Sequence, residues 1–127
     1  MVEQPAFLAS LATAARQAQY CLTVCTGSAL LAKTGLLDGL QATSNKRSFA
    51  WVKAQRPQVQ WQAQARWCVA GKFYTSSGIS AGLDMALGFV ADCCGEVKAE
   101  ETARRIEYIW HKDSNADPFA FKECPEA

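Results

Sequence analysis

The feature that most constrains the fold of this 127-residue chain is a largely apolar run that leads into a polar turn and then into a helix-forming run. Residues 20–24, YCLTV, do not alternate with polar residues, which is typical of a strand buried on both faces of a parallel sheet. Cys25 and Thr26 follow in the turn, and residues 27–33 favour a short helix. A buried strand joined directly to a helix predicts an α/β fold with a mainly parallel sheet.

The rest of the chain continues this alternation of helices and strands. Further helices are predicted at residues 5–17, from a cap at Ser44 or Asn45 to about residue 55, from an N-cap at Ser80 to residue 94, and at residues 98–111. Further strands are predicted at residues 40–44, 59–62, 66–69 and 72–75, with the last two in a hairpin around Ala70 and Gly71. Gly82 and Gly88 indicate close packing of a helix against the sheet, and residues 113–127 are predicted to be a loop.

Length and charge exclude several classes of protein. The length suits one domain, residues 1–127, and the net charge of +1 without a basic tract argues against nucleic-acid binding. The longest apolar runs are interrupted by polar residues, so no membrane span is predicted. The N-terminal residues carry an acid and no basic stretch, unlike a signal peptide. We therefore predict a cytoplasmic protein.

Six cysteines raise the question of disulfides or a metal site. A cytosolic chain of this length does not need disulfides, and no CxxC motif is present. The single His leaves zinc without ligands at usable spacing. We predict no metal and no cofactor, and expect most of the cysteines to be small core residues.

Cys25 stands where a functional residue is expected in an α/β fold. Sites in such folds form at the carboxyl ends of the strands, and the N–H groups at the start of the next helix favour a thiolate. The N–H of Thr26 is placed to stabilise an oxyanion, and Gly27 lets the backbone pass close to the turn. The alternative is a structural cysteine at the end of a strand.

Three segments resemble a known family. VCTGSALLAKTGLLDGLQATSN resembles the nucleophile region of the ThiJ/PfpI proteins, in the class I glutamine amidotransferase-like superfamily, and the isocyanide-hydratase-like branch is nearest. YTSSGISAGLDMALGFV resembles the loop and helix that close the same pocket, and IEYIWHKDSNADPFA resembles the carboxyl end of one subgroup. The resemblance implies a flavodoxin-like three-layer sandwich, usually a homodimer. It also implies that Cys25 is the nucleophile-elbow cysteine and that Ser77 and Gly78 line the pocket, with Gly27 as a further substrate-binding residue.

The chain departs from the family pattern at two points. Asn45 stands where many members have a His, and an amide cannot act as a general base. The only His, His111, is expected near the end of the last helix, where a cation or donor suits the helix terminus. Members usually begin with further strands and helices that carry an acid and a Gly-rich loop. We therefore expect an N-terminally shortened member that forms a homo-oligomer covering an exposed sheet edge.

The resemblance does not fix a reaction, because activities in the family differ. The favoured hypothesis is hydratase- or hydrolase-like chemistry at Cys25 on a small electrophilic substrate, or an oxidation-sensitive thiol. The alternative is an inactive oligomeric or partner-binding protein, and a regulatory role ranks last. Lys46 and Arg47 are interpreted in two ways, as charges that draw an anionic substrate toward Asn45 or as solvated side chains.

Overall fold

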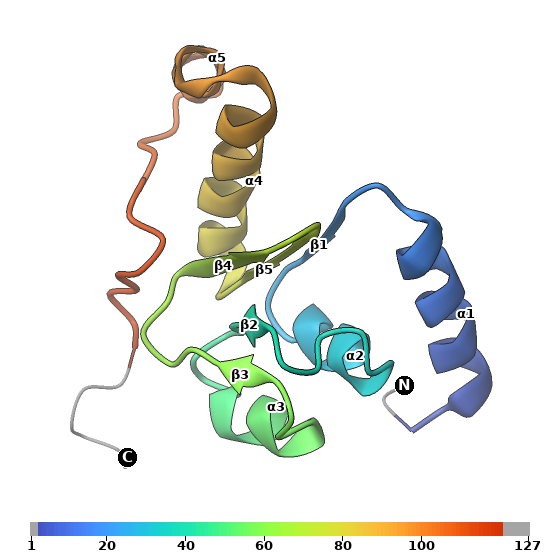
Figure 1. The fold of residues 1–127 in the computed structure, drawn as a ribbon. Helices are drawn as coiled ribbons and strands as arrows, with labels where there is room; N and C mark the ends of the chain where they lie inside the picture. The colour runs from blue at the N-terminus through green and yellow to red at the C-terminus, as the bar shows by residue number, and fades with distance from the viewer. Residues whose placement is uncertain (1–2, 121–127) are drawn as a thin grey trace.

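A computed structural model of the protein describes residues 3–120, which form a small sheet with helices on both sides (Figure 1). The elements in chain order are α1 (Pro5–Gln17), β1 (Cys21–Thr23), α2 (Gly27–Lys33), β2 (Gln41–Ala42), α3 (Phe49–Gln55), β3 (Gln60–Trp61), β4 (Trp67–Ala70), β5 (Phe73–Ser76), α4 (Ile79–Cys94) and α5 (Glu96–Arg105). The bounds of α1 and α2 are those predicted from the sequence. The predicted strands are all present: β1, β2 and β3 are shorter than predicted, whereas β4 and β5 have the predicted length and are shifted by one residue.

The central sheet is small and mixed, with β5 between β1 and β4. β1 pairs with β5 in parallel, whereas β4 pairs with β5 antiparallel, and β2 and β3 form a separate parallel pair. Two of these three pairings are thus parallel, and the antiparallel one is the hairpin predicted around Ala70 and Gly71. These two strands run antiparallel because the turn after Ala70 is tight, with Gly71 at a φ of +60°, and so short a connection joins only antiparallel strands.

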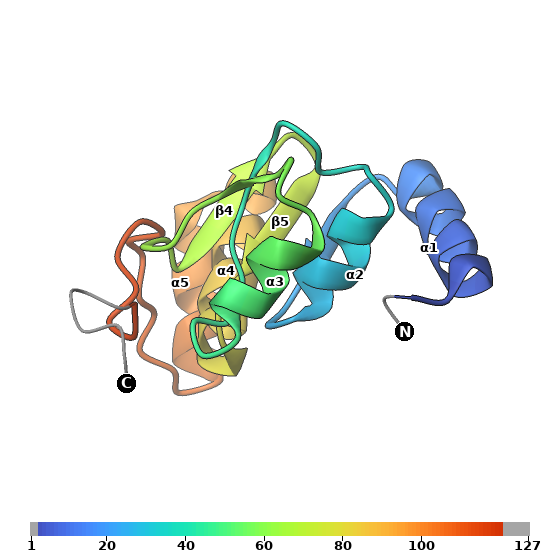
Figure 2. The same ribbon diagram turned by 90° about the horizontal axis from the view of Figure 1, so that it is seen from below.

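Neighbouring residues of β5 point into two separate cores, which gives the predicted three-layer α/β arrangement. Phe73 packs on a cluster that includes Ala15 of α1 and Leu31 of α2. Tyr74 packs on the opposite face with Trp67 and Met85. Helices α1 and α2 thus cover one face, α3 packs on α2, and α4 and α5 lie on the other side (Figure 2).

Helix α4 approaches the sheet closely at its two glycines, as the sequence predicts. A Cβ atom on Gly82 would lie 3.1 Å from both methyl groups of Val24, and one on Gly88 would lie 3.0 Å from the Trp67 ring. The helix begins at Ile79 with Gly78 at its N-cap, so the prediction of Ser80 as the cap was wrong. The early start brings the first turn of α4 to the end of β5.

The last helix ends earlier than predicted, at Arg105 rather than His111. Glu107 adopts a left-handed conformation with φ +55° and its N–H donates to Arg104 O (3.1 Å), while the Tyr108 N–H donates to Ala103 O (2.9 Å). These two bonds form a Schellman motif, which terminates a helix even where the left-handed residue is not glycine.

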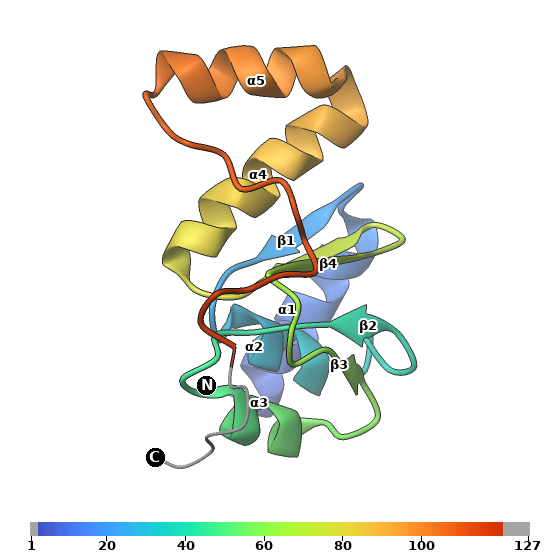
Figure 3. The same cartoon turned by 90° about the vertical axis from the view of Figure 1, so that its left-hand side faces the viewer.

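Residues 108–120, here called the strap, then run from α5 past α4 and β4 (Figure 3). Ser114 O accepts the N–H groups of Arg66 (2.6 Å) and Trp67 (3.2 Å), and the Asp117 N–H donates to Gln64 O (3.0 Å). The strap was correctly predicted to lack helices and strands beyond residue 112, but it is hydrogen-bonded along the edge of the molecule beside β4.

The cysteines are less buried than predicted. The five cysteines among residues 3–120 are free thiols: Cys21 and Cys25 are half-buried, Cys68 is buried, and Cys93 and Cys94 are exposed. The last two lie at the exposed end of α4, so the expectation of core residues was wrong for them, and Cys124 lies outside the described residues. No helix among residues 3–120 has the length and apolar character needed to cross a bilayer.

The close approach of α4 predicts that Gly88→Val destabilises the fold by about 1–3 kcal/mol, because the added methyl groups overlap the buried Trp67 ring. The small helix-propensity gain over glycine does not offset this overlap. Ala86→Val on the exposed side of the same helix is the matched control and should change stability by only about 0.5 kcal/mol. Urea unfolding measures both, and equal effects of the two substitutions would contradict the close packing.

Candidate functional site

Cys25 occupies a strained turn between β1 and α2. Its φ of +57° lies in the left-handed region, which costs a non-glycine residue about 1–2 kcal/mol. The turn is held by two backbone hydrogen bonds, from Cys25 N–H to Ser77 O (2.9 Å) and from Gly27 N–H to Val24 O (3.0 Å). The conformation matches the strand-to-helix elbow that the sequence predicts, and it exposes the cysteine side chain at the end of β1.

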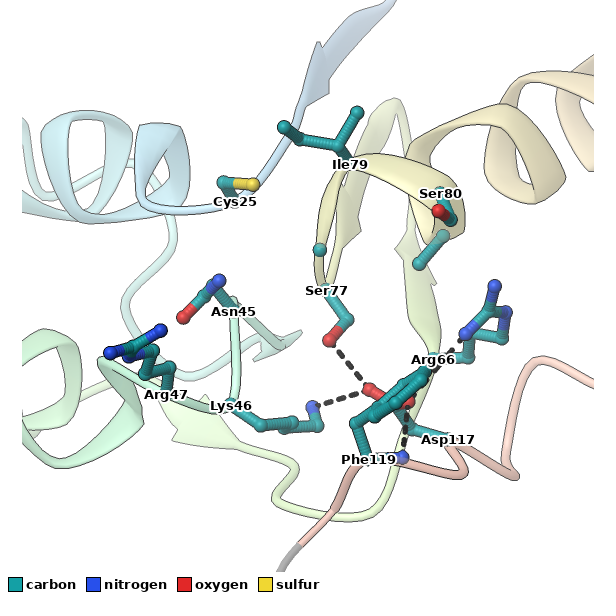
Figure 4. A pocket seen from close by; sticks show the side chains of 12 residues that line it. Cys25, Asn45, Lys46, Arg47, Arg66, Ser77, Ile79, Ser80, Asp117 and Phe119 are labelled. Carbon is teal, nitrogen blue, oxygen red and sulfur yellow. Dashed lines mark hydrogen bonds and ion pairs between the residues drawn. The ribbon is translucent and has the colours of Figure 1, made fainter.

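A cavity of about 510 Å³ opens beside this turn (Figure 4). Its walls come from the elbow, the turn before α3, the start of α4 and the strap: Cys25, Asn45, Lys46, Arg47, Arg66, Ser77, Gly78, Ile79, Ser80, Ala81, Asp117 and Phe119. The structure therefore brings together four of the residues selected from the sequence, Cys25, Asn45, Ser77 and Gly78. Thr26 and Gly27 directly follow Cys25 in the chain but do not line the cavity.

Asn45 has a local structural role as well as a place in the cavity wall. Its Oδ1 accepts the N–H of Ser48 (2.9 Å), so its side chain caps the turn that leads into α3. Helix α3 itself begins only at Phe49, with Ser48 at its N-cap, so the prediction of Ser44 or Asn45 as the helix cap was wrong. Because the oxygen is bonded to the backbone, the amide nitrogen is the end that remains for other contacts.

A buried ion-pair network forms the floor of the cavity. Arg66 contacts Asp84 through Nη2 (2.7 Å) and Nε (2.8 Å), and it contacts Asp117 through Nη1 (3.5 Å). Asp84 also accepts the backbone N–H of His111 (2.9 Å). Asp84 thus has a structural role. The expectation of His111 at a helix terminus was wrong because α5 ends before it.

Asp117 brings a carboxylate into the cavity from the strap. It accepts a hydrogen bond from Ser77 Oγ (2.5 Å) and lies 3.9 Å from Lys46 Nζ. The interpretation of the sequence missed both Asp117 and Arg66. The third family-like segment contains Asp117 before Pro118 and was the one signal available, but a loop-like sequence does not reveal which residues it contacts.

Lys46 is buried, with 5 % of its surface exposed, so its interpretation as a solvated charge was wrong. Its Nζ donates to Thr43 Oγ1 (2.6 Å), Ala65 O (2.7 Å) and Ser44 O (3.3 Å). Burial lowers the pKa of Lys46 to about 8, although Asp117 acts in the opposite direction. Arg47, one residue further along, remains exposed.

The lowered pKa of Lys46 predicts a stability that rises with pH. Between pH 8 and the ordinary pKa of 10.5, the unfolded chain still binds a proton that the folded chain has lost, so the free energy of unfolding increases with pH. Below pH 8 both states hold the proton, and the cost of burying the ammonium is fully present. We expect the difference in unfolding free energy between the native protein and Lys46→Met to shift by roughly 1–3 kcal/mol in favour of the native protein across this window.

Urea unfolding at a series of pH values measures this difference. Lys53→Met removes an exposed lysine of α3 and is the matched control, whose difference from the native protein should stay constant with pH. A Lys46→Met difference that is equally flat would contradict the burial of a titrating ammonium.

Comparison with known proteins identifies related sequences. The DJ-1/PfpI family matches residues 1–92. An isonitrile hydratase of Pseudomonas putida is 31% identical over 108 residues, which cover 85% of this chain and 46% of that protein.

Solved structures are similar as well. A ThiJ/PfpI family protein from Pseudomonas syringae superposes with a TM-score of 0.68 and 29% identity over 93% of this chain and 46% of that chain. DJ-1beta of Drosophila melanogaster gives a TM-score of 0.68 at 20% identity, over 86% of this chain and 57% of its own, which is a likeness of fold alone. The predicted flavodoxin-like α/β architecture is confirmed, and the chain spans about half the length of these relatives.

Proposed function

Because this chain belongs to the DJ-1/PfpI family, we propose that it acts on small electrophilic molecules through Cys25, in a hydratase- or hydrolase-like reaction. The observation that carries this proposal is the left-handed conformation of Cys25 at the edge of a cavity. A strained non-glycine residue persists only where the surrounding structure holds it, and such residues cluster at functional sites. We place the reaction in the cytoplasm, and the free thiols of the described cysteines fit a reducing compartment.

The chemistry can be followed for an isonitrile, the substrate class in the name of the Pseudomonas putida relative. The Cys25 thiolate bonds to the terminal carbon, and that carbon takes a proton from solvent to give a thioimidate. Water then adds to the same carbon. Breakage of the carbon–sulfur bond leaves a formamide and returns the thiolate and a proton. A carbonyl or nitrile carbon would accept the same nucleophile.

Thr26 and Asn45 have different roles in this proposal. The backbone N–H of Thr26 has no acceptor among residues 3–120, so it is available to the oxygen of the water adduct, which gains negative charge as it loses its proton and the carbon–sulfur bond breaks. Asn45 borders the cavity as a hydrogen-bond donor and cannot take a proton from water. Proton exchange therefore involves solvent. Oxidation of Cys25 to a sulfenic or sulfinic acid is a related reaction of the same thiol.

We expect iodoacetamide at neutral pH to alkylate Cys25 roughly tenfold faster than the exposed Cys93 and Cys94, because Cys25 lines the cavity just before the start of α2 and cysteines at helix N-termini are typically reactive. Peptide mass spectrometry measures each site separately. Cys25→Ala should remove the fast phase and any hydration of a test isonitrile, whereas Cys93→Ala should leave both unchanged. Alkylation of Cys25 at the rate of Cys93 would count against a reactive elbow.

A second function, as an oligomeric or partner-binding protein, is favoured by an exposed apolar surface. β1 pairs only with β5 in the described sheet, so its other edge is open. Leu22 of β1 is exposed, and so are Tyr20 and Val24, which flank the strand. Ile79 and Leu83 on the adjoining part of α4 are exposed as well. Gly82 contacts Val24 and joins the two groups. We propose that a second copy of the chain covers this edge, since open strands and apolar patches favour association.

Sedimentation velocity at micromolar concentration tests the association. The native protein should sediment as a dimer or larger assembly, and Leu22→Lys should shift it toward the monomer by placing a charge at the open edge. Val69→Lys on β4, which is also exposed, is the matched control and should leave the assembly intact. A native protein that sediments as a monomer would contradict the proposal.

A further inference from the structure

The amide of Asn45 presents a free donor to the cavity. Its Oδ1 is held by the Ser48 N–H, which fixes the orientation of the amide plane. Its Nδ2 has no acceptor among residues 3–120, and Figure 4 shows this nitrogen on the side of the amide nearer Cys25. A ligand at this wall therefore meets an N–H donor and not a carbonyl oxygen.

Arg47 adds an unpaired charge to the same wall. It lines the cavity, is exposed, and forms no ion pair within the described part of the chain. The other two cations of the cavity are already neutralised. Lys46 donates to three oxygen atoms and lies near Asp117, and Arg66 contacts both Asp117 and Asp84. The positive charge that remains for a ligand is therefore that of Arg47.

The two free donors, an amide and a guanidinium, occur two residues apart on the turn before α3, and both residues line the cavity that also contains Cys25. A planar guanidinium binds carboxylates with two parallel hydrogen bonds, and a neighbouring amide can donate to a remaining lone pair. The opposite rim carries the exposed apolar side chains of Ile79 and Phe119, which suit a short carbon chain.

We propose that Asn45 and Arg47 bind the carboxylate of the substrate, so that this cavity selects small electrophiles that carry an acid group. The inference rests on the proposed reactivity of Cys25 and defines the substrate class of the same site. The carboxylate lies on the α3 side of the cavity, with the electrophilic carbon toward Cys25 Sγ. Arg47 is then a specificity-determining residue, because a neutral electrophile gains nothing from its charge.

Two alkylating probes that differ in one group test this inference. Iodoacetate and iodoacetamide react with a thiol in the same way: the sulfur–carbon bond forms, iodide leaves, and the thiol proton passes to the buffer. Only iodoacetate carries a carboxylate. The measured quantity is the ratio of the two alkylation rate constants at Cys25, read from the Cys25 peptide by mass spectrometry, so that changes common to both probes cancel.

We expect Arg47→Gln to lower the iodoacetate-to-iodoacetamide ratio about two- to fivefold, as for the loss of one exposed ionic contact. Asn45→Ala should lower it by a smaller factor, and Arg47→Lys, which keeps the charge but not the two parallel hydrogen bonds, should give a ratio between those of the native protein and Arg47→Gln. Arg105→Gln makes the same change of net charge on the exposed face of α5 and should not alter the ratio. Added salt should lower the native ratio and leave that of Arg47→Gln nearly unchanged.

Each other outcome overturns the inference. An unchanged ratio in Arg47→Gln shows that Arg47 does not contact the acid group, and an equal fall in Arg105→Gln shows an effect of net charge alone. In both cases, fast alkylation of Cys25 by iodoacetamide would still support the proposed function. If neither probe alkylates Cys25 faster than Cys93, the proposed reactivity of Cys25 is contradicted. The proposed substrate class, which rests on that reactivity, is then contradicted as well.

Discussion

The buried guanidinium of Arg66 holds together parts of the fold that the sequence separates widely. Its side chain contacts Asp84 of α4 and Asp117 of the strap, and its own N–H and C=O bond Ser114 and Ser77. One residue next to β4 thereby fixes the strap, the first turns of α4 and the end of β5. Breaking a buried ion pair by removing one partner typically costs about 3–5 kcal/mol, so the geometry of the cavity floor depends on both carboxylates remaining in place.

The elbow depends on the same network through Ser77. The carbonyl of Ser77 accepts the Cys25 N–H, its hydroxyl donates to Asp117, and its N–H donates to Arg66 O. A single residue therefore connects the strained cysteine to the ion pairs. The rigidity that keeps Cys25 in a left-handed conformation comes from long-range contacts, since the short helix α2 alone contributes little.

Local signals in the sequence were sufficient for much of the fold. Pro5 at the first turn set the start of α1, and the two-residue turn at Gly71 set the hairpin. Gly82 and Gly88 correctly indicated close contact between α4 and the sheet. In each case the residues that carry the signal are neighbours in the chain or lie on one face of one helix.

The site was only partly predictable because its remaining groups meet over long distances in the sequence. Asp117 reaches Ser77 across forty residues, and Lys46 is buried by Ala65 and Asp117, so no local pattern distinguished either from a surface charge. The end of α5 was missed for a different reason. Glu107 takes the left-handed position that glycine usually signals, so the amphipathic pattern continued beyond the true end of the helix.

The side chain at position 45 determines what kind of chemistry the cavity wall can support. The family resemblance implies a His here in many members, which could accept a proton, whereas the amide of Asn45 cannot act as a base, and its N–H groups are free while its oxygen accepts the Ser48 N–H. Arg47 is also a donor and keeps its charge at any ordinary pH. A wall made only of donors binds an anionic group and does not exchange protons with it. The same residues that leave Cys25 without a neighbouring base on this wall therefore favour substrates held by their negative charge.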